Sequence, residues 1–155
     1  MVPALTWLWL NLMKKFIKAG KKPGNMQKIL LDTNFLLIPA QFKVDIFSEI
    51  ERICNFSYQI FILDKTIMEL ENIIKKQKGK DRDAAKLGLK LVSLKKLGIV
   101  KTEDGVSTDM SIVNTAESGF IAATQDADLK RLLKAKSIPI ITLRQKKYLI
   151  FEGKV

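Results

Sequence analysis

The stretch that decides the fold is Lys28-Ile29-Leu30-Leu31-Asp32-Thr33-Asn34-Phe35-Leu36-Leu37. An apolar run ends there at a single carboxylate, and a second apolar run follows after two small polar residues. Such a run, bounded by polar residues, is typical of a strand buried on both faces of a sheet. Ligands of open parallel sheets bind beyond the carboxyl ends of the strands, which is where Asp32 is expected. Asp also caps helices, so Asp32 is either an active-site acid or a helix cap.

The rest of the chain alternates between two kinds of apolar pattern. Short apolar runs predict strands over residues 59–63, 99–100, 120–124, 137–143 and 148–151, the last at a sheet edge. Helical spacing of apolar residues predicts helices over residues 44–54, 64–74, 83–96, 108–118 and 129–136. Pro39 is expected to break the chain before the first of these helices. Alternating strands and helices predict an α/β fold with a mainly parallel sheet.

Composition limits the class of protein. The chain has 155 residues, enough for one domain with a hydrophobic core. Its formal net charge of +11 suggests an anionic partner such as nucleic acid or a membrane surface. The single cysteine, Cys54, excludes an internal disulfide and fits a reducing, cytoplasmic location. Cys54 falls in an apolar helical pattern, which predicts a core position.

Histidine is absent from the sequence. Imidazole is the usual general acid and base at neutral pH, so its absence excludes a Ser-His-Asp triad, a Cys-His dyad and a His-ligated zinc site. Proton chemistry in an enzyme of this composition would come from carboxylates, Lys, Tyr or metal-bound water. A carboxylate-rich hydrolase would most simply use a hard cation.

Residues 1–25 differ from the rest of the chain. An apolar, aromatic segment precedes five lysines and no acid, and these lysines supply almost half of the net charge. The order of the two parts is opposite to that of a secretory signal, and the apolar part is too short to span a bilayer. An amphipathic membrane anchor is one interpretation. We favour a non-native or disordered leader followed by one domain over residues 26–155.

Acidic residues follow several of the predicted strands. Asp32 follows the first strand, Asp126 follows the strand at 120–124, and Glu69 and Asp109 lie in the first turns of helices. The carboxyl ends of parallel strands share one edge of a sheet, so these acids are expected to meet there. A cluster of like charges is costly unless a cation or protons neutralise it. The alternative is that each acid caps a helix or interacts with its dipole; for Asp64, after the second strand, we favour the cap.

Four separated segments resemble the PIN domain family of metal-dependent ribonucleases. The segments are Ile29 to Asn34, Met68-Glu69-Leu70, Thr108-Asp109 and Ala122 to Leu129. Residue 110 is Met, where archaeal relatives often show a second acid. Together with the segment at 140–146, the resemblance points to the archaeal branch of rRNA-processing nucleases and VapC-type toxins.

The resemblance implies a three-layer α/β/α sandwich with a mainly parallel central sheet. It also implies cleavage of single-stranded RNA by water with Mg²⁺ or Mn²⁺. The implied catalytic and metal-binding residues are Asp32, Glu69, Asp109 and Asp126, with Asn34, Thr124 and Asp128 supporting them.

Basic residues mark where RNA would bind. The sequence around Gly79 predicts a basic turn whose charged residues are Lys75, Lys76, Lys78, Lys80 and Arg82. Because phosphate contacts dominate affinity for RNA, this turn is our first choice for the RNA-binding surface. Lys130, Arg131 and Lys134, after Asp126, are the second choice.

Three functions are compatible with these patterns. The first is a metal-dependent endoribonuclease, either the toxin of a toxin–antitoxin pair, with a small antitoxin protein and a possible homodimer, or an RNA-processing enzyme. The second is a catalytically silent PIN-like RNA-binding module. The third, a phosphatase of the haloacid-dehalogenase type, is disfavoured because that chemistry uses a second Asp where this chain has Asn34.

Overall fold

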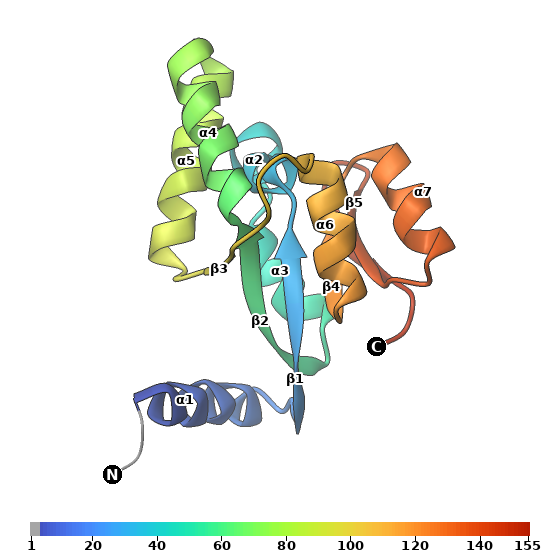
Figure 1. The fold of residues 1–155 in the computed structure, drawn as a ribbon. Helices are drawn as coiled ribbons and strands as arrows, with labels where there is room; N and C mark the ends of the chain where they lie inside the picture. The colour runs from blue at the N-terminus through green and yellow to red at the C-terminus, as the bar shows by residue number, and fades with distance from the viewer. Residues whose placement is uncertain (1–3) are drawn as a thin grey trace.

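A central parallel sheet organises the computed structural model, which describes the backbone of residues 4–155 and the side chains of residues 10–21 and 25–155 (Figure 1). The strands are β1 (Lys22–Leu31), β2 (Phe56–Leu63), β3 (Gly98–Val100), β4 (Phe120–Ala123), β5 (Ile140–Arg144) and β6 (Tyr148–Glu152). The helices are α1 (Ala4–Lys18), α2 (Thr33–Phe42), α3 (Ile46–Ile53), α4 (Asp64–Lys76), α5 (Lys80–Leu94), α6 (Thr108–Glu117) and α7 (Ala127–Ala135).

The strand order is β3-β2-β1-β4-β5-β6, so β1 lies in the interior of the sheet. Every neighbouring pair is parallel except β5 and β6, which are antiparallel. Strands β1 and β4 pair in register, Leu31 opposite Ala123. Because of this register, the residues that follow the two strands emerge side by side.

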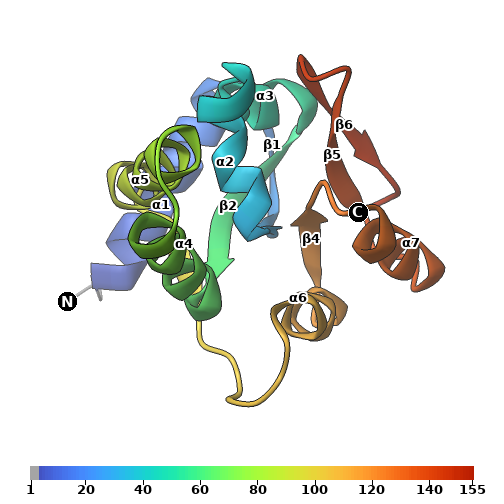
Figure 2. The same cartoon turned by 90° about the horizontal axis from the view of Figure 1, so that it is seen from above.

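Helices cover both faces of the sheet (Figure 2). One apolar cluster, which includes Ile29, Leu36 and Ala85, fills the space between the sheet and the layer of α2, α4 and α5. A second cluster, which includes Leu30, Ile112 and Leu133, packs α6 and α7 on the other face. Successive residues of β1 enter different clusters because side chains alternate along a strand. The three-layer α/β/α sandwich with a mainly parallel sheet is therefore confirmed.

Helix α2 differs from our prediction. We expected Pro39 to break the chain, but Pro39 lies inside the helix, which runs on to Phe42. Asp32 caps the helix, and Lys43 ends it in the left-handed conformation. Residues 35–38 of α2 are all buried, so its sequence shows no polar face and does not display a helical period.

The N-terminal segment, for which we expected a disordered or non-native leader, carries a helix in the structure. Helix α1 lies at the amino end of the strands, and β1 begins at Lys22 (Figure 1). Met13 and Phe16 are buried, and the ring of Phe16 meets that of Tyr58 edge to face at 5.0 Å. That residues 1–25 are a non-native leader stays a prediction. Within residues 4–155, none of the helices has both the length and the apolar character needed to cross a bilayer.

Candidate functional site

Asp32 and Thr124 meet where β1 and β4 end. The hydroxyl of Thr124 donates a hydrogen bond to Asp32 Oδ2 at 2.9 Å, and the backbone N–H of Thr33 donates to Asp32 Oδ1 at 2.7 Å. Asp32 is only 6% exposed and Thr124 is fully buried. The carboxylate of Asp32 therefore caps α2, as one interpretation had it, and it also lies at the carboxyl edge of the sheet. The role of Asp32 as an active-site acid stays a prediction.

Burial raises the pKa of Asp32 to about 6. Desolvation is the main cause, because a buried carboxylate loses the water that stabilises its charge. The hydrogen bonds from Thr124 and Thr33 oppose this shift, and the negative charges of Asp109 and Glu69 add to it. Asp32 is thus electrostatically coupled to two acids that lie far from it in sequence.

Glu69 and Asp109 come from helices on opposite layers of the sandwich. Glu69 lies in α4, and it accepts a hydrogen bond from the hydroxyl of Thr108, the first residue of α6. Asp109 follows in the same turn, and its pKa is raised by partial burial and by the charges of Asp126 and Glu69. The contact between Thr108 and Glu69 brings the two helix ends together over the edge of the sheet.

Asp126 completes the acidic group. Its Oδ1 accepts a hydrogen bond from the N–H of Leu129 at 2.8 Å and so caps α7. Its own N–H donates to Thr124 Oγ1 at 3.1 Å. The Thr124 hydroxyl therefore accepts from the backbone of Asp126 while it donates to Asp32, and it fixes these two acids relative to each other.

The structure thus brings the four predicted acids to one end of the sheet. Asp32 is coupled to Glu69 and Asp109, and Asp109 is coupled to Glu69 and Asp126. Their side chains are not closed around one point: within residues 4–155, no three His, Cys, Asp or Glu side chains are arranged to hold a metal ion as they stand.

The predicted supporting residues differ in their placement. Thr124 lies at the centre of the site. Asn34 is exposed in the first turn of α2, and its side chain makes no hydrogen bond to other residues that the structure describes. Asp128 is exposed at the surface and forms an ion pair with Arg131 in the same helix. The roles proposed for Asn34 and Asp128 stay predictions.

The predicted basic turn is shorter than the sequence suggested. Lys75 and Lys76 lie in the last turn of α4, Lys80 and Arg82 in the first turn of α5, and residues 77–79 join them. All five basic residues are exposed at the tip of this helical hairpin. In the second basic group, Lys130 donates to Thr142 Oγ1 at 3.3 Å, and Arg131 and Lys134 are ion-paired with Asp128 and Glu152. The basic residues of the hairpin tip are therefore more available to bind RNA than those of the second group, which already have partners within the protein.

Sequence reasoning missed several residues that support the acids. Thr33 and Thr66 are buried, and their hydroxyls are 3.2 Å apart, which ties the start of α2 to α4. Lys65 lies one helical turn before Glu69 and reaches the loop that precedes α6. A hydroxyl or a lysine near a helix start has no distinctive spacing, so the sequence held no signal for these contacts.

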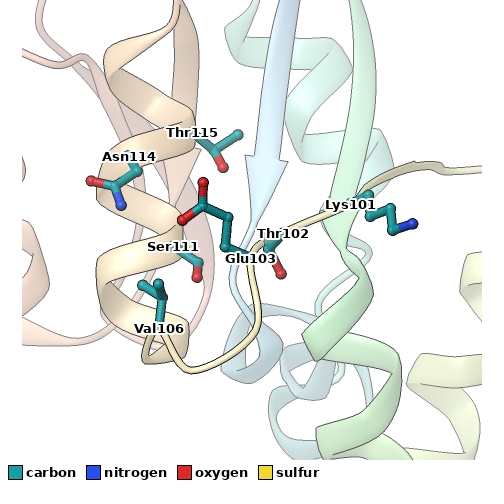
Figure 3. Close-up of a pocket in the computed structure, with 7 residues that line it drawn as sticks. All are labelled: Lys101, Thr102, Glu103, Val106, Ser111, Asn114 and Thr115. Carbon is teal, nitrogen blue, oxygen red and sulfur yellow. The ribbon is translucent and has the colours of Figure 1, made fainter.

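A polar cavity of about 220 Å³ lies between the loop that precedes α6 and α6 itself (Figure 3). The loop from Lys101 to Val106 forms one wall, and Ser111, Asn114 and Thr115 of α6 form the other. The side chains lining the cavity do not include the four acids. The cavity is therefore a feature of the loop and α6, and the candidate site lies at the helix starts next to it.

Comparison with known proteins gives consistent results. The family described as "PIN like domain" matches residues 29–146. The chain is 35% identical over 132 residues to a protein named Ribonuclease VapC4 from Methanocaldococcus jannaschii, covering 84% of this chain and 100% of that protein. It is 31% identical over 125 residues to Ribonuclease VapC9 from Archaeoglobus fulgidus, covering 79% of this chain and 87% of that one.

Solved structures resemble the fold. A structure described as the PIN domain endonuclease Utp24 superposes with a TM-score of 0.69 at 24% identity, covering 85% of this chain and 96% of that chain. A domain of a functionally unknown protein from Methanocaldococcus jannaschii superposes with a TM-score of 0.52 at 19% identity, over 83% and 96% of the two chains. At these identities, the likeness supports the fold.

Proposed function

Since the chain belongs to the PIN-like domain family, we propose that it is a divalent-metal-dependent endoribonuclease that hydrolyses single-stranded RNA. The observation that carries this proposal is the buried carboxylate of Asp32, coupled to the charges of Glu69 and Asp109 at the carboxyl edge of the sheet. Such an arrangement costs stability in the protein alone, and a bound cation would offset that cost.

The donor set fits a hard cation. Asp32, Glu69, Asp109 and Asp126 offer oxygen atoms only, and the chain has no histidine, which favours Mg²⁺ or Mn²⁺ over softer metals. Asp32 uses each carboxylate oxygen for one hydrogen bond, so each keeps a lone pair. We propose these four acids as the ligands. When bound, the metal would activate a water and neutralise charge on the phosphate.

Other residues of the chain would orient the acids and bind the RNA. Thr124 holds Asp32 and Asp126 in fixed relation through its hydroxyl. Thr108 orients Glu69, and so joins the acid of α4 to that of α6. The exposed lysines and Arg82 of the hairpin tip would hold the RNA backbone. Lys130 and Arg131 are a weaker second choice because both already have partners within the protein.

The biological role that we propose is that of a toxin. The two relatives are named VapC ribonucleases, and the chain spans 100% and 87% of their lengths. An antitoxin protein would then be a partner, and the toxin would act in the cytoplasm as a homodimer. An RNA-processing role remains the alternative, and growth arrest on expression, relieved by a co-expressed antitoxin, would separate the two.

Cleavage of RNA tests the proposed activity. Purified protein is incubated with single-stranded RNA and Mn²⁺, and the fragments are resolved by length. We expect cleavage that EDTA abolishes and that Asp32→Asn reduces at least a hundredfold. Asp104→Asn, which removes an exposed acid from a loop, serves as the matched control and should cleave as the wild type does. RNA binding without cleavage would instead support a silent RNA-binding module.

A further inference from the structure

Lys65 connects α4 to the loop that leads into α6. Its Nζ donates to the carbonyl oxygens of Glu103 at 2.7 Å and Val106 at 2.6 Å, and to Ser111 Oγ at 2.9 Å. A lysine ammonium has three protons, so these three acceptors use all of them. Glu103 and Val106 lie in the loop, and Ser111 lies in α6 itself. One side chain therefore holds the loop against the first turns of α6.

Asp64, the neighbour of Lys65, holds the other end of the same loop. Its Oδ2 accepts from the N–H of Thr102 at 3.1 Å, and its Oδ1 accepts from the Thr102 hydroxyl at 2.5 Å. These bonds hold the pKa of Asp64 below its usual range. Asp64 also accepts from the N–H of Lys65. It is the first residue of α4, and Leu63 occupies the cap position without a side-chain bond, so the cap that we predicted at Asp64 is wrong. Residues 102–106 are thus fixed at both ends by the start of α4.

We call the contacts that Lys65 makes with the loop and with Ser111 the clamp. The geometry of α4 places this clamp close to the acids. Lys65 and Glu69 are four residues apart and therefore share a face of the helix. The loop held by Lys65 continues to Ser107, which caps α6, and then to Thr108, which donates to Glu69. Asp109 follows directly. Glu103, Asp104 and Gly105, in the middle of the loop, are exposed, so they have little packing of their own to fix the path of the chain.

We propose, on the basis of the proposed function, that Lys65 is a positioning residue: by clamping the 102–106 loop to α6 it keeps Asp109 opposite Glu69, and it thereby sets the affinity for the divalent cation. It acts through backbone carbonyls and Ser111, and it does not touch the acids. The loop path is visible in Figure 3, where it runs from Thr102 past Glu103 to Val106 beside α6.

The sign of the effect separates positioning from simple charge. Lys65 is positive, so if only its charge mattered, its removal would make the acidic site bind a cation more tightly. If Lys65 positions the acids, its removal allows Asp109 to move away from Glu69 and weakens binding of the cation. Loss of residues that orient metal ligands typically weakens metal binding by about 10- to 100-fold.

The test measures Mn²⁺ binding by calorimetry on folded, RNA-free protein. Lys65→Met should weaken Mn²⁺ binding about tenfold and speed amide hydrogen exchange in residues 102–107. Lys65→Arg, which keeps a cation and several donors, should recover part of the affinity. Lys101→Met is the matched control: Lys101 is exposed at the start of the same loop, and its loss should not weaken binding.

Each outcome decides the inference. Equal or tighter Mn²⁺ binding by Lys65→Met, with wild-type binding intact, would overturn the positioning role and leave the proposed function standing. Failure of the wild-type protein to bind Mn²⁺ would overturn both. If Lys65→Met does not fold, Ser111→Ala removes only one of the three acceptors, and it should weaken binding about two- to threefold; unchanged binding there would contradict the clamp.

Discussion

Asp32 occupies a position where a negative charge is unfavourable. The carboxylate is nearly inaccessible to water and lies within the field of Glu69 and Asp109. Two hydrogen bonds, from Thr124 and Thr33, compensate for only part of this cost, since the pKa of Asp32 stays raised at about 6. A carboxylate in this position destabilises the free protein, and we expect a bound cation to offset that cost.

The raised pKa predicts a pH-dependent stability of the metal-free protein. Unfolded Asp32 loses its proton near pH 4, whereas folded Asp32 keeps it until about pH 6. Between these values the folded state binds more protons, so the contribution of Asp32 to the unfolding free energy falls as pH rises and then levels off above pH 6. The full loss is about 3 kcal/mol, at 1.36 kcal/mol for each pKa unit.

Asp32→Asn isolates this effect. The variant should be more stable than the wild type by about 1–3 kcal/mol at pH 7.5 in EDTA, and this advantage should vanish or reverse near pH 4. Chemical denaturation at both pH values measures it, with Asp104→Asn as the control. A stability difference that does not change with pH would show that Asp32 does not carry an unfavourable charge in the folded state.

At the scale of elements, the packing of α2 against α5 positions Asp32. Helix α2 begins directly after Asp32, and it lies close to α5 because Gly88 has no side chain. A Cβ at residue 88 would lie 3.1 Å from the carbonyl oxygen of Leu36 and 3.4 Å from its Cβ. The backbone of α2 would have to move to accept it.

Gly88→Val should therefore destabilise the protein by about 1–3 kcal/mol and reduce RNA cleavage as α2 shifts. Denaturant unfolding measures the first effect. Lys86→Val places the same side chain at an exposed position of α5, where it should cost only a few tenths of a kcal/mol. Equal stability of the two variants would mean that the contact between α2 and α5 does not require glycine.

Some helices and strands could be predicted from the sequence, and others could not. The strand before Asp32 and helices α4, α5, α6 and α7 were predicted because their apolar residues follow a period or stop at a polar residue. Helix α2 was missed because it is buried nearly all round and carries Pro39. The acids could be predicted from their place after strands and from the family resemblance. The contacts of Lys65 could not, since two of its three acceptors lie in a loop whose path is set by tertiary structure and the third, Ser111, lies in α6.

At the scale of the whole molecule, charge is unevenly distributed. The acids lie at the carboxyl end of the sheet, and exposed basic residues lie at the tip of the hairpin of α4 and α5 (Figure 1). Lys75 is six residues beyond Glu69, which is about 9 Å along the helix. An RNA strand that lies at the acids could therefore reach the tip within a few nucleotides.

Replacing Lys75, Lys76 and Lys78 by Gln should weaken RNA binding and reduce its salt dependence. Each phosphate contact contributes about 0.7 to the slope of log affinity against log salt for single strands, so the slope should fall by about 2. Fluorescence anisotropy at several salt concentrations measures the slope. The control replaces three exposed lysines of α1, Lys14, Lys15 and Lys18, at the opposite end of the strands. Equal losses in both variants would mean that total charge, and not the hairpin tip, attracts RNA.

Anomalous X-ray diffraction from Mn²⁺-soaked crystals would test the central claim most directly. We expect one or two anomalous peaks at coordination distance, about 2.2 Å, from carboxylate oxygens of Asp32, Glu69, Asp109 or Asp126, and none there in crystals of Asp32→Asn. Well-ordered crystals with Mn²⁺ bound only at other acids, or with the four carboxylates unchanged and no peak between them, would contradict the account.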